Sequence, residues 1–533
     1  MVVNLAELLT VAREEAPDAV ALVEADTGRE ITWAALDAEV DRVTCGLAEL
    51  GLVAGYRVMI ALTNRIEFFA TYLAVLRARL VAVPVNPRSA TGELVRMMAD
   101  SGSRAVFADA ATITGARSAA AGLHDALVGA DEELRARAVV PHLVTVGVPT
   151  VPGETAYETL GASGVAAAHV AGAQDPEALA VLLYTSGTSG RPRAAMLTHR
   201  ALVTNIEQGA EVDPPAIGPG DRVFGVLPMF HVYGLNAVFG AVLRFQAGVV
   251  LANGFDVEGS LDLIHDHGVT VVPVAPPVFA YWRGVDGLSE RLSGVRLLLS
   301  GSAPLAPELV EEFKARTGKD VQQGYGLTEA APVVTSTLVS RVPKSGSVGA
   351  ALPGIEIRLR DEHGEAPEGE DPGEIQIRGA NLFSGYWPDG ADGPGADGWY
   401  GTGDVGFLDP DGDLFLVDRL KELVIVSGFN VYPSEIEDVI SDVEGVAEAA
   451  VIGAPDPSTG EKVVAFVVAK RTTSLMPEEL EAAVRDRCMQ RLARFKQPKE
   501  IHVVEELPHT ATGKVAKGRL RAVRRRQHLG LLE

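Results

Sequence analysis

The chain has 533 residues, of which 47% are hydrophobic and 22% charged, and its formal net charge is −24. A chain of this length is too long to form one hydrophobic core and predicts about three or four domain-sized units. The composition is typical of a soluble globular protein. The negative charge argues against a nucleic-acid-binding protein, and no apolar run is long enough to span a membrane. The two cysteines, Cys45 and Cys488, and a start without a basic signal-like segment predict a reduced, cytoplasmic setting.

Short apolar runs alternate with helical patterns in the first half of the chain. Residues 58–62 and 81–85 have the composition of strands, and residues 68–80 between them have that of a helix. A second series of the same kind covers residues 223–299. Such alternation is typical of βαβ units around parallel sheets, so we expect an α/β fold with two similar layers.

The composition changes after about residue 340. Short strands separated by Asp, Gly and Pro predict a smaller β-rich subdomain over residues 340–420, with an exposed loop at 388–398. A βα pattern begins again at Ser434. It predicts a compact α+β domain at the C-terminal end, of ordinary domain size.

A loop of hydroxyl residues and glycines follows the apolar run 179–183, and it reads Tyr184-Thr185-Ser186-Gly187-Thr188-Ser189-Gly190. Glycine lets backbone N–H groups turn toward an anion, and Ser and Thr hydroxyls add donors, so the loop suits a polyphosphate. It is not a Walker A loop, because no Gly-Lys-Ser/Thr follows at the required spacing. Taken alone, such a loop is more often an ordinary turn.

Four further segments follow in a fixed order. They are Leu299–Pro304, Gln323–Glu329, Tyr400–Asp404 with Asp418–Glu422 close behind, and Pro508–Lys514. Together with the first loop, they resemble the adenylate-forming superfamily of acyl-CoA synthetases, peptide-synthetase adenylation domains and luciferases. The resemblance extends from about Leu8 to Arg526. Segment 227–236 is most similar to that of fatty acyl-CoA and coumarate-CoA ligases.

The resemblance implies a fold and a reaction. Residues 1–420 would form an ATP- and acyl-binding domain of two α/β layers and a small β-barrel, and residues 421–533 a mobile lid hinged at Lys421. The reaction would use ATP and Mg²⁺ to convert an acid into acyl-AMP and pyrophosphate, and coenzyme A would then displace AMP. Since anions meet in the first step, the protein must supply cations and hydrogen-bond donors.

The same resemblance assigns roles to single residues. Lys514, Glu329 and Thr185 would be catalytic, with Glu329 and Thr185 holding Mg²⁺ and Lys514 reaching the α-phosphate. Tyr325 would stack on adenine, and Asp404 would accept the ribose hydroxyls. The full set of implied ATP-binding residues is Thr185, Ser186, Gly187, Thr188, Ser189, Gly190, Arg193, Gly301, Ser302, Ala303, Gln323, Gly324, Tyr325, Gly326, Thr328, Asp404 and Arg419.

The implied acyl pocket holds no carboxylate. Its residues would be His231, Tyr233, Gly234, Val274, Pro276, Gly301, Gly324, Ala330 and Val333. An amino acid would therefore bury an unpaired ammonium there, which is costly, so a small-molecule acid with an apolar fatty or aryl tail is favoured, as in fatty acid metabolism. Gly234 and Ala330 are interpreted as leaving room for this tail. The residues implied to bind coenzyme A are His231, Ser427 and Gly428.

Two departures from the family pattern leave the function open in part. Arg193-Ala194 stands where the family usually has Lys-Gly, which replaces an ammonium with a planar fork and removes the freedom to adopt a positive φ. Residues 423–428 are apolar where coumarate-type ligases place lysines near coenzyme A. An acyl carrier protein is therefore an alternative acceptor, and a non-catalytic nucleotide-binding protein is a second alternative. A monomer or a homodimer is expected.

Each candidate residue also has a purely structural interpretation. Asp404 can cap a turn, Glu329 can begin a helix, and Lys514 can be an ordinary surface lysine. Arg419 can pair with a neighbouring carboxylate. His231 is equally compatible with an aromatic gate to the thiol and with a hydrogen-bonded histidine at a strand end. The order of the motifs favours the functional interpretation for Glu329, Asp404 and Lys514.

Overall fold

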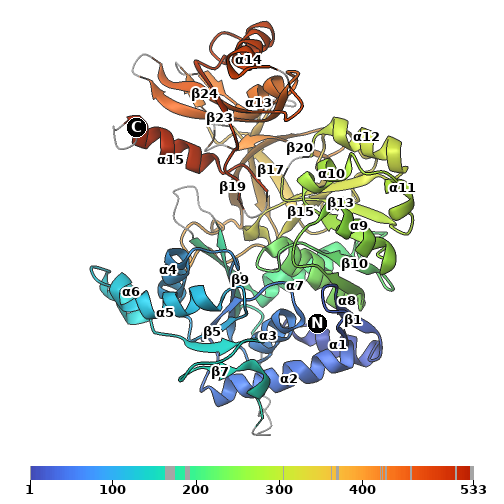
Figure 1. Ribbon diagram of the computed structural model, residues 1–533, viewed down its shortest axis with the longest axis vertical. Helices are drawn as coiled ribbons and strands as arrows, with labels where there is room; N and C mark the ends of the chain where they lie inside the picture. The colour runs from blue at the N-terminus through green and yellow to red at the C-terminus, as the bar shows by residue number, and fades with distance from the viewer. Residues whose placement is uncertain are drawn as a thin grey trace. The chain divides into compact units, whose positions relative to one another are not determined.

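The computed structural model divides the chain into two compact units, whose elements are labelled in Figure 1. The first unit contains residues 1–186, 192–356 and 378–399, and the second contains mainly 357–377 and 400–533. The structure describes residues 2–162, 175–185, 193–303, 305–361, 363–367, 371–419, 422, 424–426, 429–456, 459–473, 475–510 and 513–528.

One sheet of the first unit has seven strands in the order β7-β6-β5-β3-β4-β8-β9. All neighbours are parallel except β8 and β9, which form an antiparallel pair at one edge. The strands are β3 (Arg57–Ala61), β4 (Val81–Pro84), β5 (Ala105–Ala108), β6 (His142–Thr145), β7 (Thr155–Ala156), β8 (Leu179–Thr185) and β9 (Arg193–Thr198).

The other sheet of this unit has nine strands in the order β16-β15-β14-β13-β12-β10-β11-β1-β2. Its central strands are parallel, and the antiparallel pairs lie toward its two edges. The strands are β1 (Val20–Glu24), β2 (Glu30–Thr32), β10 (Arg222–Gly225), β11 (Gly248–Leu251), β12 (Val271–Val274), β13 (Leu297–Ser300), β14 (Val321–Gly326), β15 (Val333–Ser336) and β16 (Ala350–Ala351).

Helices of the first unit begin and end at residues suited to those positions. Thr198 caps α7 by accepting a hydrogen bond from the Ala201 N–H at 3.1 Å, and α12 begins with Pro307 and ends before Gly318 at φ +70°. The helices are α1 (Glu7–Glu15), α2 (Trp33–Glu49), α3 (Ile66–Arg77), α4 (Thr91–Ser101), α5 (Ile113–Ala126), α6 (Glu132–Arg137), α7 (His199–Ala210), α8 (Phe239–Phe245), α9 (Val257–Asp266), α10 (Pro276–Trp282), α11 (Leu288–Arg291) and α12 (Pro307–Thr317). Shorter turns are η1 (Tyr157–Thr159), the π-helical η2 (Tyr233–Val238) and η3 (Thr328–Ala330).

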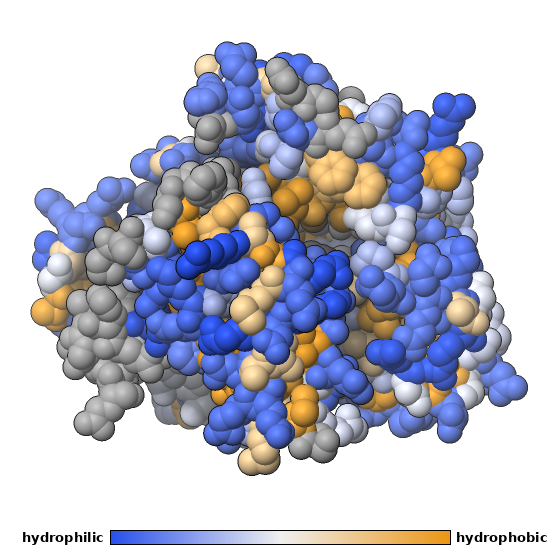
Figure 2. Space-filling view, turned by 90° about the horizontal axis from the view of Figure 1, so that it is seen from above, coloured by the Kyte–Doolittle hydropathy of each residue, from blue (hydrophilic) through white to orange (hydrophobic). Residues whose placement is uncertain are grey.

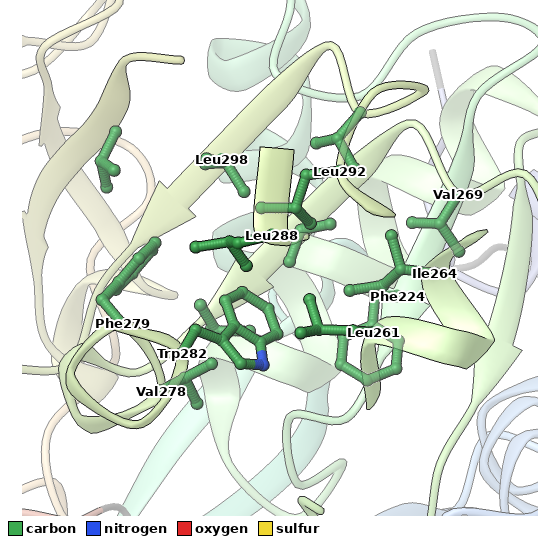
Figure 3. Packing of buried hydrophobic residues seen from close by; sticks show 14 of the residues in the cluster. Phe224, Leu261, Ile264, Val269, Val278, Phe279, Trp282, Leu288, Leu292 and Leu298 are labelled. Carbon is green, nitrogen blue, oxygen red and sulfur yellow. The ribbon is translucent and has the colours of Figure 1, made fainter. Parts of the chain in front are cut away.

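The core beside the nine-stranded sheet is built from large apolar side chains of α9, α10, α11 and the strands they cover (Figure 3). Trp282 is fully buried in it, and its indole N–H donates to the Ser260 hydroxyl at 3.0 Å. Phe279 packs edge-on against Phe313 of α12, with ring centroids 5.2 Å apart. This packing fixes the strands whose carboxyl ends carry the residues considered below, and such strand ends are where open α/β sheets bind ligands.

The second unit contains two sheets. Strands β17 (Glu356–Arg360), β18 (Gly373–Arg378), β19 (Tyr400–Leu408) and β20 (Leu414–Arg419) form a four-stranded sheet in this order. The other sheet has the order β22-β21-β24-β23, with β25 also pairing with β24. Its elements are β21 (Val424–Val426), β22 (Phe429–Val431), α13 (Pro433–Ser441), β23 (Val446–Asp456), β24 (Gly460–Ala469), α14 (Pro477–Arg491), β25 (Glu500–Val504) and α15 (Lys517–His528).

The predicted fold class is confirmed. The expected βαβ alternation is present as β3, α3 and β4, and the region predicted as a small barrel forms the sheet β17 to β20. The boundary at residue 420 stays a prediction, since Lys421 lies outside the described residues. Among the described residues no helix is both long and apolar enough to span a membrane. The face seen in Figure 2 is mainly hydrophilic, with smaller apolar areas between.

Candidate active site

Glu329 lies in η3, the turn that follows β14, and only 9% of it is exposed. The turn ends at Ala331, which adopts φ +66°, a left-handed conformation that is rare for a residue other than glycine. Such a conformation persists only where the surroundings hold it, and it is common at functional sites. The hydroxyl of Tyr386 donates a hydrogen bond to Oε1 of Glu329.

Three buried side-chain amides hold this turn from different parts of the first unit. Each donates to a backbone carbonyl of residues 330–333, and leaving a buried carbonyl without a partner would be costly. The bonds are Asn381 Nδ2 to Ala330 O at 2.7 Å, Asn236 Nδ2 to Ala331 O at 2.6 Å, and Asn205 Nδ2 to Val333 O at 2.8 Å. The position of Glu329 is therefore set by residues distant in sequence.

Thr185 is the last residue of β8, and it lies directly opposite Arg193, the first residue of β9. Its hydroxyl donates to the Arg193 carbonyl at 3.3 Å. The loop between these two strands, with Ser186, Gly187, Thr188, Ser189 and Gly190, lies outside the described residues. Ala194 is buried and extended, paired with Tyr184. The loss of glycine there therefore imposes no strain, and the concern about a positive φ was wrong.

The residues implied to bind adenine lie at the neighbouring ends of β13 and β14, where Ser300 pairs with Gln323. Gly301, Ser302 and Ala303 follow β13, and Gln323, Gly324, Tyr325 and Gly326 are in β14. Ser302 adopts φ +75°, and Tyr325 is 7% exposed with its N–H donating to the Thr335 hydroxyl at 3.3 Å. The sequence segments predicted to cooperate thus lie side by side.

The residues implied to bind the acid divide into an accessible and a buried group. Tyr233 packs directly on Gly301, because a Cβ at residue 301 would lie 2.9 Å from the tyrosine ring. Enclosure of the phenol raises the pKa of Tyr233 well above its usual value, although part of the residue stays accessible. The accessible members are His231, Tyr233, Gly324 and Val333, whereas Gly301 is buried against the Tyr233 ring.

The buried members correct part of the sequence interpretation. Val274 and Ala330 have no accessible surface, and Pro276 is buried as well, so they lie behind the accessible residues. Gly234 leaves no room for an acyl tail, because a Cβ there would lie 2.6 Å from the Pro228 carbonyl oxygen. The glycine is needed for this close approach of the backbone.

His231 precedes the π-helical turn η2, a type of turn often found at functional sites. The Nδ1 of the His231 ring accepts a hydrogen bond from the backbone N–H of Tyr233 at 3.3 Å. The backbone N–H of His231 donates to the Pro228 carbonyl at 3.1 Å. The ring is half-buried. The hydrogen-bonded interpretation of this histidine is therefore correct in geometry, and it is compatible with a role as a gate.

In the second unit, Asp404 of β19 lies directly opposite Arg419 of β20. Asp404 is 9% exposed, and its N–H donates to the Thr402 hydroxyl at 3.1 Å. This register places two of the residues implied to bind ATP next to each other on one sheet. Lys421, Ser427 and Gly428, the predicted hinge and coenzyme A contacts, lie outside the described residues.

Lys514 lies on an exposed turn that is closed mainly by its own backbone. The Thr510 N–H donates to the Lys514 carbonyl at 2.7 Å, and the Lys514 N–H donates to the Thr510 hydroxyl at 3.1 Å. An isolated bridge between His509 and Val515 flanks the turn. Lys517, three residues after Lys514, contacts Glu422 at 3.0 Å and Glu437 at 2.9 Å. Burial lowers the pKa of Lys517, but the two carboxylates raise it by more, so that the pKa is raised overall.

The donor groups present fit Mg²⁺ held together with a polyphosphate. The described residues contain no cluster of three or more His, Cys, Asp or Glu side chains suited to a metal ion. Mg²⁺ in nucleotide sites usually takes one or two carboxylates plus phosphate oxygens, and it prefers hard oxygen ligands. The carboxylate of Glu329 and the hydroxyl of Thr185 are ligands of that type.

Sequence reasoning missed the residues that position this site. Tyr386, Asn205, Asn236 and Asn381 were not among the candidates, although each contacts the turn of Glu329 or its flanks. One signal was available for Tyr386, since an aromatic pair, Tyr386-Trp387, directly precedes the Gly- and Asp-rich loop. The asparagines carry no local signal.

Comparison with known proteins gives two family matches and full-length relatives. Residues 9–387 match the family of the AMP-binding enzyme, and residues 435–514 match the AMP-binding enzyme C-terminal domain. The chain is 34% identical to 4-coumarate–CoA ligase 5 of Oryza sativa subsp. japonica over 95% of this chain and 92% of that protein. It is also 34% identical to a long-chain-fatty-acid–CoA ligase of Yersinia pestis, over 89% and 86% of the two chains.

The fold is shared with solved structures as well. The crystal structure of ATP-bound MatB from Rhodopseudomonas palustris is similar with a TM-score of 0.85 and 31% sequence identity. The similarity covers 98% of this chain and 99% of that one. Both the large α/β part and the C-terminal part are therefore shared along their length.

Proposed function

This chain belongs to the AMP-binding enzyme family and is an AMP-forming acid–CoA ligase, and on that premise we propose that its natural acid is apolar, a fatty or aryl carboxylic acid. ATP is the nucleotide substrate, in keeping with the ATP-bound relative. Membership of this enzyme family sets aside the non-catalytic alternative. The relatives named for 4-coumarate and for long-chain fatty acids span the two acid classes in the proposal.

The observation that carries the proposal is the contact between Tyr233 and Gly301. A Cβ at Gly301 would clash with the tyrosine ring, so the end of β13 and the beginning of η2 meet without a gap. The other accessible residues near these strand ends, Gly324 and Val333, carry no charge. Nothing among the proposed acyl-contacting residues would balance a buried ammonium, which favours an acid without one.

The reaction then follows in two steps. An oxygen of the acid attacks the α-phosphorus of ATP, the bond from that phosphorus to the bridging oxygen breaks, and pyrophosphate leaves. The thiol of coenzyme A, losing its proton, attacks the acyl carbon, and AMP leaves with the bonding electrons. Mg²⁺, when bound, would supply positive charge to the phosphates.

The protein's own groups would position these reactants. We assign the phosphate and Mg²⁺ contacts to Thr185 and Glu329, and the ribose hydroxyls to Asp404. Lys514 would place an ammonium beside the α-phosphate in the first step, where fixed charge stabilises the transition state most effectively. An exposed turn such as that of Lys514 is suited to a lid that engages for one step and withdraws for the next.

A pyrophosphate-release screen tests the proposal. The purified chain would be given MgATP, coenzyme A and a panel of acids from acetate to stearate, together with benzoate, coumarate and several amino acids. We expect release to be fastest with one apolar acid, and mass spectrometry should detect its CoA thioester. Fastest release with an amino acid would contradict the proposed acid class.

The acceptor is tested in the same assay. Because residues 423–428 are apolar, an acyl carrier protein is the rival acceptor, and a phosphopantetheinylated carrier protein would replace coenzyme A in a parallel reaction. We expect thioester formation with free coenzyme A. Thioester on the carrier protein alone would overturn this part of the proposal and leave acyl-AMP formation intact.

A further inference from the structure

Residues 384–387 pair with β9 and so fix the position of Tyr386. The Ser384 N–H donates to the Met196 carbonyl at 3.0 Å, and the Trp387 N–H donates to the Ala194 carbonyl at 2.9 Å. Tyr386 itself forms a bridge with Ala195. The backbone of this tyrosine is thus held directly beside the strand that begins at residue 193.

The side chain of Tyr386 connects this segment to Glu329. Its hydroxyl donates to Oε1 of Glu329, and its ring packs edge-on against Phe383, with ring centroids 5.1 Å apart. The Phe383 N–H also donates to the backbone carbonyl of Glu329 at 2.9 Å. Both the carboxylate and the backbone of Glu329 therefore depend on this short segment.

Arg193 lies over the ring of Tyr386. The guanidinium carbon lies 3.8 Å from the centroid of the Tyr386 ring, and Nη2 is 2.8 Å from Oδ2 of Asp392. A planar guanidinium can stack on a ring and donate from its edge at the same time, whereas a lysine ammonium is a point charge. Arg193 is therefore committed to the Tyr386 ring and to Asp392.

A cation over the ring changes what the tyrosine does. Positive charge beside a phenol draws electron density from it and makes the hydroxyl a stronger hydrogen-bond donor, here toward a carboxylate. The carbonyl of the same arginine accepts the Thr185 hydroxyl at 3.3 Å. Arg193 thus contacts Thr185 directly and Glu329 through Tyr386, and these are the two residues assigned to Mg²⁺.

We propose that Arg193 is a positioning residue that orients the Glu329 carboxylate through Tyr386 and does not itself bind phosphate. The inference rests on the proposed function, because it concerns how the nucleotide and its divalent cation are held. It also accounts for arginine at a position where the family usually has lysine. With Arg193 stacked on Tyr386 and Tyr386 hydrogen-bonded to Glu329, nucleotide binding would depend more on Mg²⁺ than it would without Arg193.

Binding of ATP to the full chain, measured by calorimetry without acid, tests this inference. Affinities would be compared with Mg²⁺ and with EDTA for the native chain and for R193A, R193K, Y386F and R193A/Y386F. We expect R193A to weaken MgATP binding about tenfold and to leave metal-free ATP binding within about twofold. Y386F should match it, and R193K should lie between R193A and the native chain.

The double variant shows whether Arg193 acts through the tyrosine. If it does, R193A/Y386F binds MgATP no more weakly than Y386F alone, because the effects of coupled residues do not add. R378A is the matched control, since Arg378 stacks on Trp399 at 4.8 Å and pairs with Glu356 at 2.6 Å in the same unit. It should change neither affinity.

Three outcomes would overturn the inference. Equal weakening with and without Mg²⁺ would mean that Arg193 contacts phosphate directly, and additive losses in the double variant would mean that it does not act through Tyr386. If R193A does not fold, unchanged MgATP binding by both Y386F and R193K would refute the proposal that Arg193 acts on Glu329 through Tyr386. Failure of the native chain to bind ATP at all would instead contradict the proposed function.

Discussion

The turn that carries Glu329 and the turn that carries Lys514 are held in opposite ways. Glu329 is 9% exposed, and the carbonyls around it accept hydrogen bonds from asparagines on α7, on η2 and in the segment after β18. Lys514 is exposed, and its turn is closed by bonds between residues 510 and 514. The first turn is held by buried side chains that are distant in sequence, whereas Lys514 is exposed and bonded to Thr510, four residues before it.

This difference suits the two roles proposed for the residues. A carboxylate that holds a metal ion and phosphates must keep one geometry, because misplacement by a fraction of an ångström weakens electrostatic stabilisation. A lysine that acts only in the first of two steps must be able to leave. An exposed lysine side chain can change its contacts without disrupting a buried core.

The largest expected effect is at Lys514. Lys514→Ala should slow acyl-AMP formation by about a hundredfold or more, because an ammonium at the α-phosphate stabilises charge in the transition state. Conversion of supplied acyl-AMP into the thioester should change little. Quench-flow measurement of each half-reaction checks this, with Lys470→Ala, another exposed lysine of the same unit, as the control. Equal losses in both half-reactions would contradict the separate roles of the lid.

Acid should loosen the support of Glu329 through His199. This buried histidine begins α7, accepts the Leu5 N–H on Nδ1 at 3.2 Å, and has its pKa lowered by burial to about 4. The neutral histidine therefore contributes its full share to the free energy of unfolding above the unfolded pKa of about 6.5. This share, about 3 kcal/mol in total, is lost as the pH falls toward 4.

Urea unfolding of the native chain and of His199→Gln at several pH values measures this contribution. As the pH falls from 6.5 to 4, the native chain should lose more unfolding free energy than the variant does. This interval lies between the unfolded and the folded pKa of the histidine. A difference that does not change with pH would mean that the histidine takes up a proton as readily in the folded as in the unfolded chain.

A smaller effect is expected at Asn381, which donates to the Ala330 carbonyl. Asn381→Ala leaves a buried carbonyl without a partner and should cost about 1–3 kcal/mol of stability. Acyl-AMP formation should fall by about tenfold, since Glu329 lies in the same turn. Asn253→Ala removes an exposed bond to Asp26 and serves as the control in thermal unfolding and pyrophosphate exchange. Equal, small losses in the two variants would show that the turn is not held in this way.

The smallest effect is expected at Thr510, whose hydroxyl accepts the Lys514 N–H. Because the bond is exposed, Thr510→Ala should lower stability by less than about 1 kcal/mol and acyl-AMP formation by about twofold. The same pyrophosphate exchange assay measures it beside Asn381→Ala. A loss at Thr510 larger than that at Asn381 would reverse the contrast between the two turns.

Local sequence patterns predicted the elements of this fold well. The buried strands β3 and β4 appear as apolar runs because parallel strands are covered on both faces, and Gly-rich segments marked the strand ends that meet at Ser300 and Gln323. The family resemblance supplied the roles of Glu329, Asp404 and Lys514, and these remain predictions. The register of Asp404 with Arg419 agrees with a joint role.

The rest of the site depends on contacts between distant residues. Asn236 and Ala331 are 95 positions apart, and no periodicity or motif reports that one amide caps the other's carbonyl. The interpretation of Gly234 failed for the same reason, since the space beside a glycine is decided by the Pro228 backbone that packs there. Arg193 was recognised as a departure, but its partners, Tyr386 and Asp392, come almost two hundred residues later in the chain.

The contact between Gly301 and Tyr233 has a consequence for how this enzyme could acquire a new substrate. In the proposed assignment Gly301 belongs to both the nucleotide site and the acyl site, and a Cβ there would lie 2.9 Å from the Tyr233 ring. A larger side chain at position 301 would have to displace the tyrosine ring, and by the proposed assignment it would alter both sites at once. Substitutions that change the preferred acid and keep the affinity for ATP should therefore occur at His231 or Val333, which are accessible. The contact between Gly301 and Tyr233 should stay unchanged.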